Sequence, residues 1–213
     1  MREVIVSSFF LALAGCSQLI ELQNDSQEMT LNYTNKDVND AKFYMFQQEC
    51  SATIEKINKN SNENYQQTDW MKILTAEGEP YFSLNWKFLK EKYGGYLSQA
   101  YSWWLNHLDK TERIVDDAAL LIDHDRLRIY IIELEKFIDR NPKFVDIEEV
   151  KSRLSWYLNI YLSGLDNNTP IYDRRTHTIN QEVRLSYEKF LSENRNSKYC
   201  PLVKKLYETT KRK

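Results

Sequence analysis

The sequence predicts an all-α fold, a single domain of antiparallel amphipathic helices that follows a flexible N-terminal tether. Glycine and proline are scarce, with 5 and 4 among 213 residues, whereas about 7% and 5% are usual. So few turn-forming residues argue against a many-stranded barrel or sandwich. Apolar side chains recur instead at the three- and four-residue spacing of helices, between polar segments.

Three segments of the N-terminal half are expected to be helical: residues 37–58, 69–76 and 82–108. In the first segment the expected apolar face consists of Val38, Ala41, Met45, Ile54 and Ile57. The second segment is short, and the pair Gly94 and Gly95 should divide the third into two helices.

Four segments of the C-terminal half also predict helices, because each begins near a capping side chain or a proline. They are residues 110–140, broken near Asp123, residues 146–163, residues 180–193 and the segment from Pro201 onward. The segment from 146 to 163 has the most complete pattern, with Asp146 as its cap and Gly164 as its stop.

This half also contains an internal echo. Glu135-Lys136-Phe137-Ile138 and Glu188-Lys189-Phe190-Leu191 are 53 residues apart, as are Asn141 and Asn194. In each case an amphipathic helix ends at a polar turn and a second amphipathic helix follows. The pattern resembles the helix–turn–helix units of tetratricopeptide-like proteins, with a period longer than the roughly 34 residues of that family. Unrelated amphipathic helices are the alternative.

The chain starts with a segment typical of secretory signals. Arg2 is followed by an apolar run from Val4 to Ala14, which only two serines interrupt. A bilayer-spanning helix needs about 20 apolar residues, so this run is too short to span a membrane. Its length and flanks match the apolar region of a signal peptide.

The run ends in Leu13-Ala14-Gly15-Cys16, which resembles the lipobox of bacterial lipoproteins. The resemblance implies that residues 1–15 are a signal peptide and are removed. It also implies that the thiol of Cys16 receives a diacylglyceryl group and that the new amino terminus is acylated, for example with palmitate.

The same resemblance implies how the mature chain is organised. Residues 16–35 would form the lipidated tether, and residues 36–213 would form the helical domain. Ser17 stands where an aspartate tends to retain Gram-negative lipoproteins at the inner membrane. The resemblance therefore implies the outer membrane, with the body facing the periplasm; in a host with one membrane it would face outward.

Two cysteines, Cys50 and Cys200, are left once Cys16 is lipidated. An oxidising periplasm favours one disulfide between them, and two unpaired, buried thiols are the alternative. Neither cysteine lies in a CxxC motif, so thiol catalysis is not expected.

Aromatic residues make up 13% of the chain, and aromatic side chains with polar tips are enriched at interfaces. A candidate binding surface combines aromatic residues of the middle helices with two arginines that suit a carboxylate or a phosphate. Its members are Tyr93, Tyr96, Tyr101, Trp103, Trp104, Arg174 and Arg175. The alternative is that these aromatic side chains fill a helical core.

The densest polar cluster of the sequence centres on Asp123, His124 and Asp125. Metal ligands on a helix should recur three or four residues apart, so helix capping is the favoured interpretation. The sequence contains no P-loop, dinucleotide-binding fingerprint, zincin helix or nucleophile elbow. We therefore expect no metal and no other cofactor.

A net charge of -2 and a pI of about 6.0 provide no basic field for nucleic acid. We therefore expect a membrane-anchored envelope lipoprotein that binds another envelope protein as a non-catalytic interaction or scaffold protein. Two alternatives are an immunity protein that neutralises a toxin in the periplasm and a cell-wall hydrolase that uses Glu and His side chains.

Overall fold

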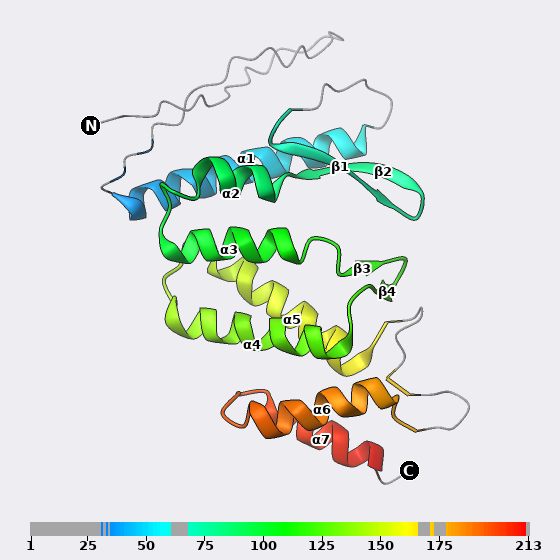
Figure 1. The fold of residues 1–213 in the computed structure, drawn as a ribbon. Helices are drawn as coiled ribbons and strands as arrows, with labels where there is room; N and C mark the ends of the chain where they lie inside the picture. Colours follow the sequence, from blue (N-terminus) through cyan, green and yellow to red (C-terminus); the bar gives the residue numbers. More distant parts are fainter. Residues whose placement is uncertain are drawn as a thin grey trace. The chain divides into compact units, whose positions relative to one another are not determined.

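The fold is mostly helical in a computed structural model, which describes Leu31, Tyr33 and residues 35–60, 68–165, 171–172 and 178–211. These residues form seven α-helices and two small β-hairpins (Figure 1). The chain divides into two compact units, Met1–Thr111 and Glu112–Lys213. None of the helices described is long and apolar enough to cross a bilayer.

The elements of the first unit are α1 (Lys36–Lys59), β1 (Met71–Ala76), β2 (Glu79–Leu84), α2 (Trp86–Tyr93) and α3 (Gln99–Lys110). Those of the second unit are β3 (Val115–Asp116), β4 (Ala119–Leu120), α4 (His124–Arg140), α5 (Ile147–Ser163), α6 (Gln181–Glu193) and α7 (Cys200–Lys211). The mostly helical character expected from the sequence is confirmed, and the two hairpins depart from an all-α fold.

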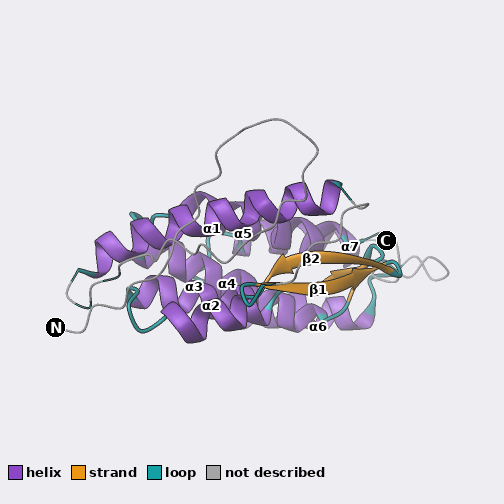
Figure 2. Cartoon of the chain, turned by 90° about the horizontal axis from the view of Figure 1, so that it is seen from above, coloured by secondary structure: helices purple, strands orange, loops and turns teal. Residues whose placement is uncertain are grey.

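The β1–β2 hairpin stands where the sequence pattern predicts a short helix over residues 69–76, and that prediction is wrong. Glu77 and Gly78 form a two-residue turn with φ angles of 51° and 85°, the pair of left-handed residues that closes a tight hairpin. Ala76 pairs with Glu79 across this turn. β-Branched side chains on β1 and aromatic side chains on β2 favour the extended backbone, and Figure 2 shows the two paired strands.

Helix α1 buries a more polar face than its sequence predicts. Three of the apolar residues expected in the core are exposed, namely Val38, Ala41 and Met45. Asn39 and Asp40 are buried instead. The Asn39 amide donates to the backbone oxygen of Tyr96 (2.8 Å), and the Asp40 carboxylate accepts from the backbone N–H of Ser98 (2.9 Å). These two bonds fasten the connection between α2 and α3 to α1.

Side-chain caps begin α4 and α6 where the sequence predicts them. Asp123 accepts from the backbone N–H of Arg126 at 2.5 Å, and Asn180 accepts from that of Glu182 at 3.1 Å. Gly164, with a φ of 75°, follows the last residue of α5 as expected. The three predicted boundaries are therefore confirmed.

The segment before α4 is not helical, although the sequence pattern predicts helix from residue 110 to a break near Asp123. A turn follows α3, and strands β3 and β4 then form a minimal hairpin. Asp117 and Ala118 close it with φ angles of 46° and 53°. Aspartate tolerates this left-handed backbone better than most residues, which explains why the chain turns here.

The 53-residue echo falls on two helical hairpins, α4–α5 and α6–α7. Each connection is six residues long, from 141 to 146 and from 194 to 199. Both turns contain the same three backbone hydrogen bonds, at 2.9 to 3.1 Å. In the first turn they run from Asn141 N to Phe137 O, from Phe144 N to Asn141 O and from Ile147 N to Phe144 O. In the second they run from Asn194 N to Phe190 O, from Ser197 N to Asn194 O and from Cys200 N to Ser197 O. The turns share one geometry, while the resemblance to tetratricopeptide-like repeats stays a prediction.

Candidate binding sites

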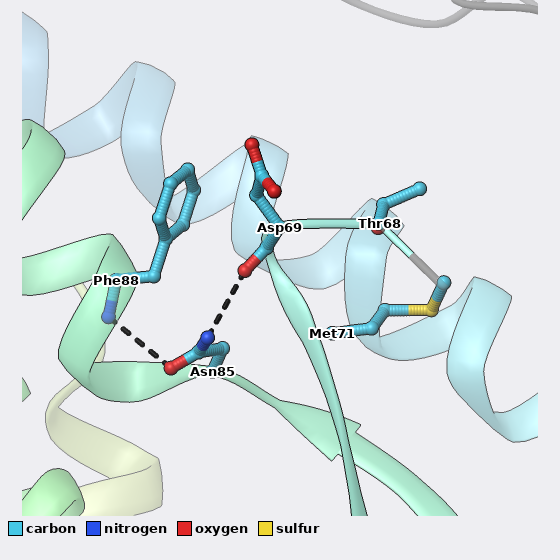
Figure 3. Close-up of a pocket in the computed structure, with 5 residues that line it drawn as sticks. All are labelled: Thr68, Asp69, Met71, Asn85 and Phe88. Carbon is cyan, nitrogen blue, oxygen red and sulfur yellow. Dashed lines mark hydrogen bonds between the residues drawn. The ribbon is translucent and has the colours of Figure 1, made fainter. Parts of the chain in front are cut away.

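A pocket opens at the base of the β1–β2 hairpin in the first unit (Figure 3). Its volume is about 510 Å³, and its described lining consists of Thr68, Asp69, Met71, Asn85 and Phe88. Thr68 and Asp69 precede β1, and Met71 begins it; Asn85 lies between β2 and α2, and Phe88 is in the first turn of α2. The hairpin therefore creates the pocket by bringing the two strand ends together beside a helix N-terminus.

Asn85 holds the three parts of the pocket together. Its Oδ1 accepts from the backbone N–H of Phe88 (3.2 Å) and so caps α2, while its Nδ2 donates to the backbone oxygen of Asp69 (3.1 Å). Its own backbone N–H donates to the carbonyl of Trp70 at 2.9 Å. One side chain thereby fixes the strand ends and the helix relative to one another.

The five described lining residues offer groups that can bind a ligand, and none of these five forms a nucleophile–base pair. Asp69 presents an exposed carboxylate and Phe88 a half-buried ring. The buried Oγ1 of Thr68 has no hydrogen-bond partner among the described residues. A carboxylate beside an aromatic ring suits a cationic or hydrogen-donating ligand group.

Three of the five aromatic residues of the predicted binding surface are core residues. Tyr93 and Tyr101 pack against Phe43, with ring centroids 5.4 and 5.1 Å apart. The Tyr101 hydroxyl donates to Gln47 at 3.0 Å, and Trp104 is fully buried. Burial raises the pKa of Tyr93 to about 12. For these three residues the core alternative is correct.

Tyr96 and Trp103, the other two aromatic members, are partly exposed. The Tyr33 hydroxyl donates to the Tyr96 hydroxyl (2.8 Å), and the two ring centroids are 4.3 Å apart. The ring of Trp103 stacks on that of His107 at 5.2 Å. Tyr96 and Trp103 are thus partly open to solvent, and each is held in place by a neighbouring ring, that of Tyr33 or of His107.

Several predicted site residues lie outside the described residues. They are Cys16 with the residues before it, and the two arginines of the predicted surface, Arg174 and Arg175. The lipidation of Cys16 and a role of the arginines in binding therefore stay predictions.

Cys50 and Cys200 are free thiols in this structure. Cys50 is buried in the first unit, where desolvation raises the pKa of its thiol to about 12. Cys200 is half-buried at the start of α7, in the second unit. A disulfide between them in an oxidising compartment stays a prediction.

His124 lies in a buried polar cluster of the second unit. Its Nε2 is 3.0 Å from the backbone oxygen of Tyr161, which also accepts from the Tyr187 hydroxyl at 2.8 Å. Ser186 donates to the His124 carbonyl (3.2 Å), so its hydroxyl and the imidazole do not form a nucleophile–base pair. Burial lowers the pKa of His124 to about 4, and the ring is neutral at pH 7.

The two aspartates beside His124 serve helix α4. Asp123 caps it, and Asp125 accepts from Arg128 Nε (2.7 Å) and Lys189 Nζ (2.9 Å). Burial raises the pKa of Asp125, but hydrogen bonds and charge from Arg128 and Lys189 outweigh it, and the net shift is downward. No group of three or more His, Cys, Asp or Glu side chains in the described part of the chain could hold a metal ion.

Comparison with known proteins finds no match: no family model, no curated protein and no solved structure is similar to this chain. The candidate pocket therefore rests on the geometry of this chain alone. The sequence nevertheless contains a pattern from which the hairpin and the pocket could have been predicted. Glu77-Gly78, between two segments rich in β-branched and aromatic residues, indicates a hairpin, and Asn85 then stands at a helix cap.

Proposed function

We propose that this chain is a lipid-anchored protein of the bacterial cell envelope, whose mostly helical body binds a protein partner without catalysing a reaction. The observation that carries the proposal is Leu13-Ala14-Gly15-Cys16 at the end of a short apolar run. Each buried CH₂ of an acyl chain contributes about 0.8 kcal/mol, and two or more chains hold a protein firmly at a membrane. A lipidated cysteine therefore anchors the chain without a spanning helix.

The position of the anchor and the pocket support the rest of the proposal. Ser17 after the cysteine favours the outer membrane, where the body would face the periplasm and residues 16–35 would be its tether. Among the described residues, the lining of the pocket supplies a carboxylate, a hydroxyl and an aromatic ring and includes no His, Cys or Lys side chain. Such a lining suits the recognition of a partner's polar side chain.

One experiment tests both parts of the proposal. The wild-type chain and the Cys16→Ala variant are expressed in the native host with labelled palmitate and purified by affinity capture from detergent-solubilised membranes. We expect label on the wild-type chain, no label on Cys16→Ala, and full label on the matched control Cys200→Ala. We also expect envelope proteins to accompany the wild-type chain.

Two results would contradict the proposal. Palmitate on the Cys16→Ala chain would contradict lipidation at Cys16, because the label must then be attached to another residue. A wild-type chain that retains no protein and cleaves purified peptidoglycan would replace the binding role by a hydrolytic one.

A further inference from the structure

The β1–β2 hairpin has one edge that another element covers. In an antiparallel ladder, residues at alternate positions direct their backbone groups away from the partner strand. On β2, Phe82 occupies such a position. Its N–H donates to Asn58 Oδ1 (2.8 Å), and its carbonyl accepts from Asn58 Nδ2 (2.9 Å). The Asn58 amide, at the end of α1, bonds this edge as a third strand would.

The other edge, on β1, has outward backbone groups at Met71, Ile73 and Thr75. The N–H of Met71 donates to the carbonyl of Thr68 at 3.1 Å, and no described residue forms a hydrogen bond with the outward groups of Ile73 and Thr75. Both side chains are exposed, Ile73 by 52%. A strand edge of this kind is a template for pairing with another strand.

We propose that β1 pairs with β1 of a second copy of this chain, antiparallel about a two-fold axis at Leu74. This register sets Ile73 opposite the partner's Thr75, and Thr75 opposite the partner's Ile73. Each opposed pair exchanges two backbone hydrogen bonds, so the dimer forms four such bonds and uses the N–H and the carbonyl of Ile73 and Thr75 in both chains. The result is a four-stranded sheet with the two β1 strands at its centre.

The side chains along this register match one another. On one face, the β-branched Ile73 and Thr75 meet, a combination that stabilises cross-strand pairs. On the other face, Leu74 meets the partner's Leu74 across the axis. Both contacts bring together side chains without charge.

The charged residues favour a second copy over an unrelated strand. Lys72 comes opposite the partner's Ala76, which itself pairs with the partner's Glu79 in the hairpin register. Because alanine is short, the lysine side chain can extend over it toward that glutamate. Symmetry creates this pairing of opposite charges twice, and no like charges face each other across the axis.

Disulfide trapping tests the register. The non-hydrogen-bonded pair at the axis has Cα atoms about 4.5 Å apart, within the range of roughly 4.4–6.8 Å that a disulfide needs. We expect the purified full-length Leu74→Cys chain to form a reducible dimer on mild oxidation. Ser83→Cys is the matched control, because Ser83 lies on β2 opposite Lys72, and the two β2 strands at the outside of the proposed sheet are about 14 Å apart. The wild-type chain measures the background from its own cysteines.

Two further sets of variants separate pairing from chance collision. Thr75→Pro, added to Leu74→Cys, removes two of the four intermolecular bonds and leaves the hairpin ladder, because Thr75 stands opposite Pro80 at a non-bonded position. We expect about tenfold less trapped dimer. Lys72→Glu should also reduce trapping, and Lys72→Glu combined with Glu79→Lys should restore it.

Circular dichroism of each variant checks that the fold is retained. The dimer is overturned if Leu74→Cys forms no more covalent dimer than Ser83→Cys or the wild-type chain. It is equally overturned if a folded Thr75→Pro variant is trapped as well as its parent, since the β1 edge would then not be the interface.

Discussion

Single polar side chains take the place of missing backbone partners in both units. Asn58 completes the edge of β2, and Asn85 fastens the strand ends to α2. In the second unit, Glu135 accepts from the Ser197 hydroxyl (2.6 Å) and from the backbone N–H of Lys198 (2.8 Å) in the turn before α7. Glu135 is buried, and leaving a buried polar group unpaired costs about 1–3 kcal/mol, so its two bonds stabilise the turn before α7. The bonds of Asn58 and Asn85 are more exposed and mainly fix the positions of the elements they join.

His124 makes the stability of the second unit depend on pH. Its pKa is about 4 in the folded chain and 6.5 in the unfolded chain, so the unfolded chain binds more protons between these values. Stability is therefore greatest above pH 6.5 and falls as the pH decreases toward 4, by about 3 kcal/mol at most. We expect urea unfolding, followed by circular dichroism, to show this loss between pH 7 and pH 4.5.

His124→Gln is the matched variant, because a glutamine amide can also donate to the carbonyl of Tyr161 but does not titrate. It should lose most of the pH dependence that the wild-type chain shows in this range. Equal pH dependence in the two proteins would assign the effect to other groups.

Helix boundaries were predictable from the sequence where a residue within three positions determines them. The buried face of a helix was not predictable where residues far along the chain determine it. The caps Asp123 and Asn180 determine helix starts through bonds within three residues. A helix start was predicted at both places, although the sequence left Asp125 as an alternative cap to Asp123. The polar buried face of α1 was not, because Asn39 and Asp40 find their partners 57 and 58 residues away. An apolar pattern alone assigns the wrong face when polar groups are satisfied by such long-range bonds.

The hairpin and its pocket were missed for a related reason. Six residues from Met71 to Ala76 fit either a helical turn or a strand, and periodicity cannot separate the two over so short a run. What decides is the turn at Glu77 and Gly78 together with Asn58, which bonds the hairpin from another helix. The pocket lining follows from that hairpin and so could not be derived without it.

The C-terminal end of α2 has space for a glycine but not for a larger residue at position 94, whereas position 95 is open. A Cβ built on Gly94 would lie 2.5 Å from the carbonyl oxygen of Lys90, whereas one built on Gly95 meets nothing within 4 Å. Gly94→Ala must therefore shift the backbone at the C-terminus of α2. We expect it to lower the free energy of unfolding by about 1–3 kcal/mol.

Gly95→Ala is the control for this effect, since it changes the same residue type one position away. We expect it to change the free energy of unfolding by about 0.5 kcal/mol or less. Thermal and urea unfolding of both variants measure the difference, and similar losses in the two would show that contact with Lys90 is not the cause.

At the scale of the whole molecule, the sequence predicts one helical domain from residue 36 to residue 213, and the chain divides into two compact units. The second unit has 102 residues (213 minus 111), which is within the usual size of independent domains. Its core joins distant elements: Tyr161 packs against Tyr187 and Phe190, with ring centroids 5.1 and 5.9 Å apart. These contacts join α5 and α6, which both belong to the second unit, so the unit contains a hydrophobic core of its own.

We therefore expect a fragment of residues 112–213 to fold by itself, with a helical circular dichroism spectrum and one cooperative urea transition. A fragment of residues 112–199 is the matched comparison, because it lacks α7. That helix supplies Val203, which is fully buried, and Tyr207, whose hydroxyl donates to Glu188 at 2.5 Å. Without α7 the side of α6 that packs against it, where Tyr187 lies beside Tyr207, loses its cover, and the urea transition should become less cooperative. An unfolded spectrum for the 112–213 fragment would show instead that the whole chain folds as one domain, as the sequence pattern predicts.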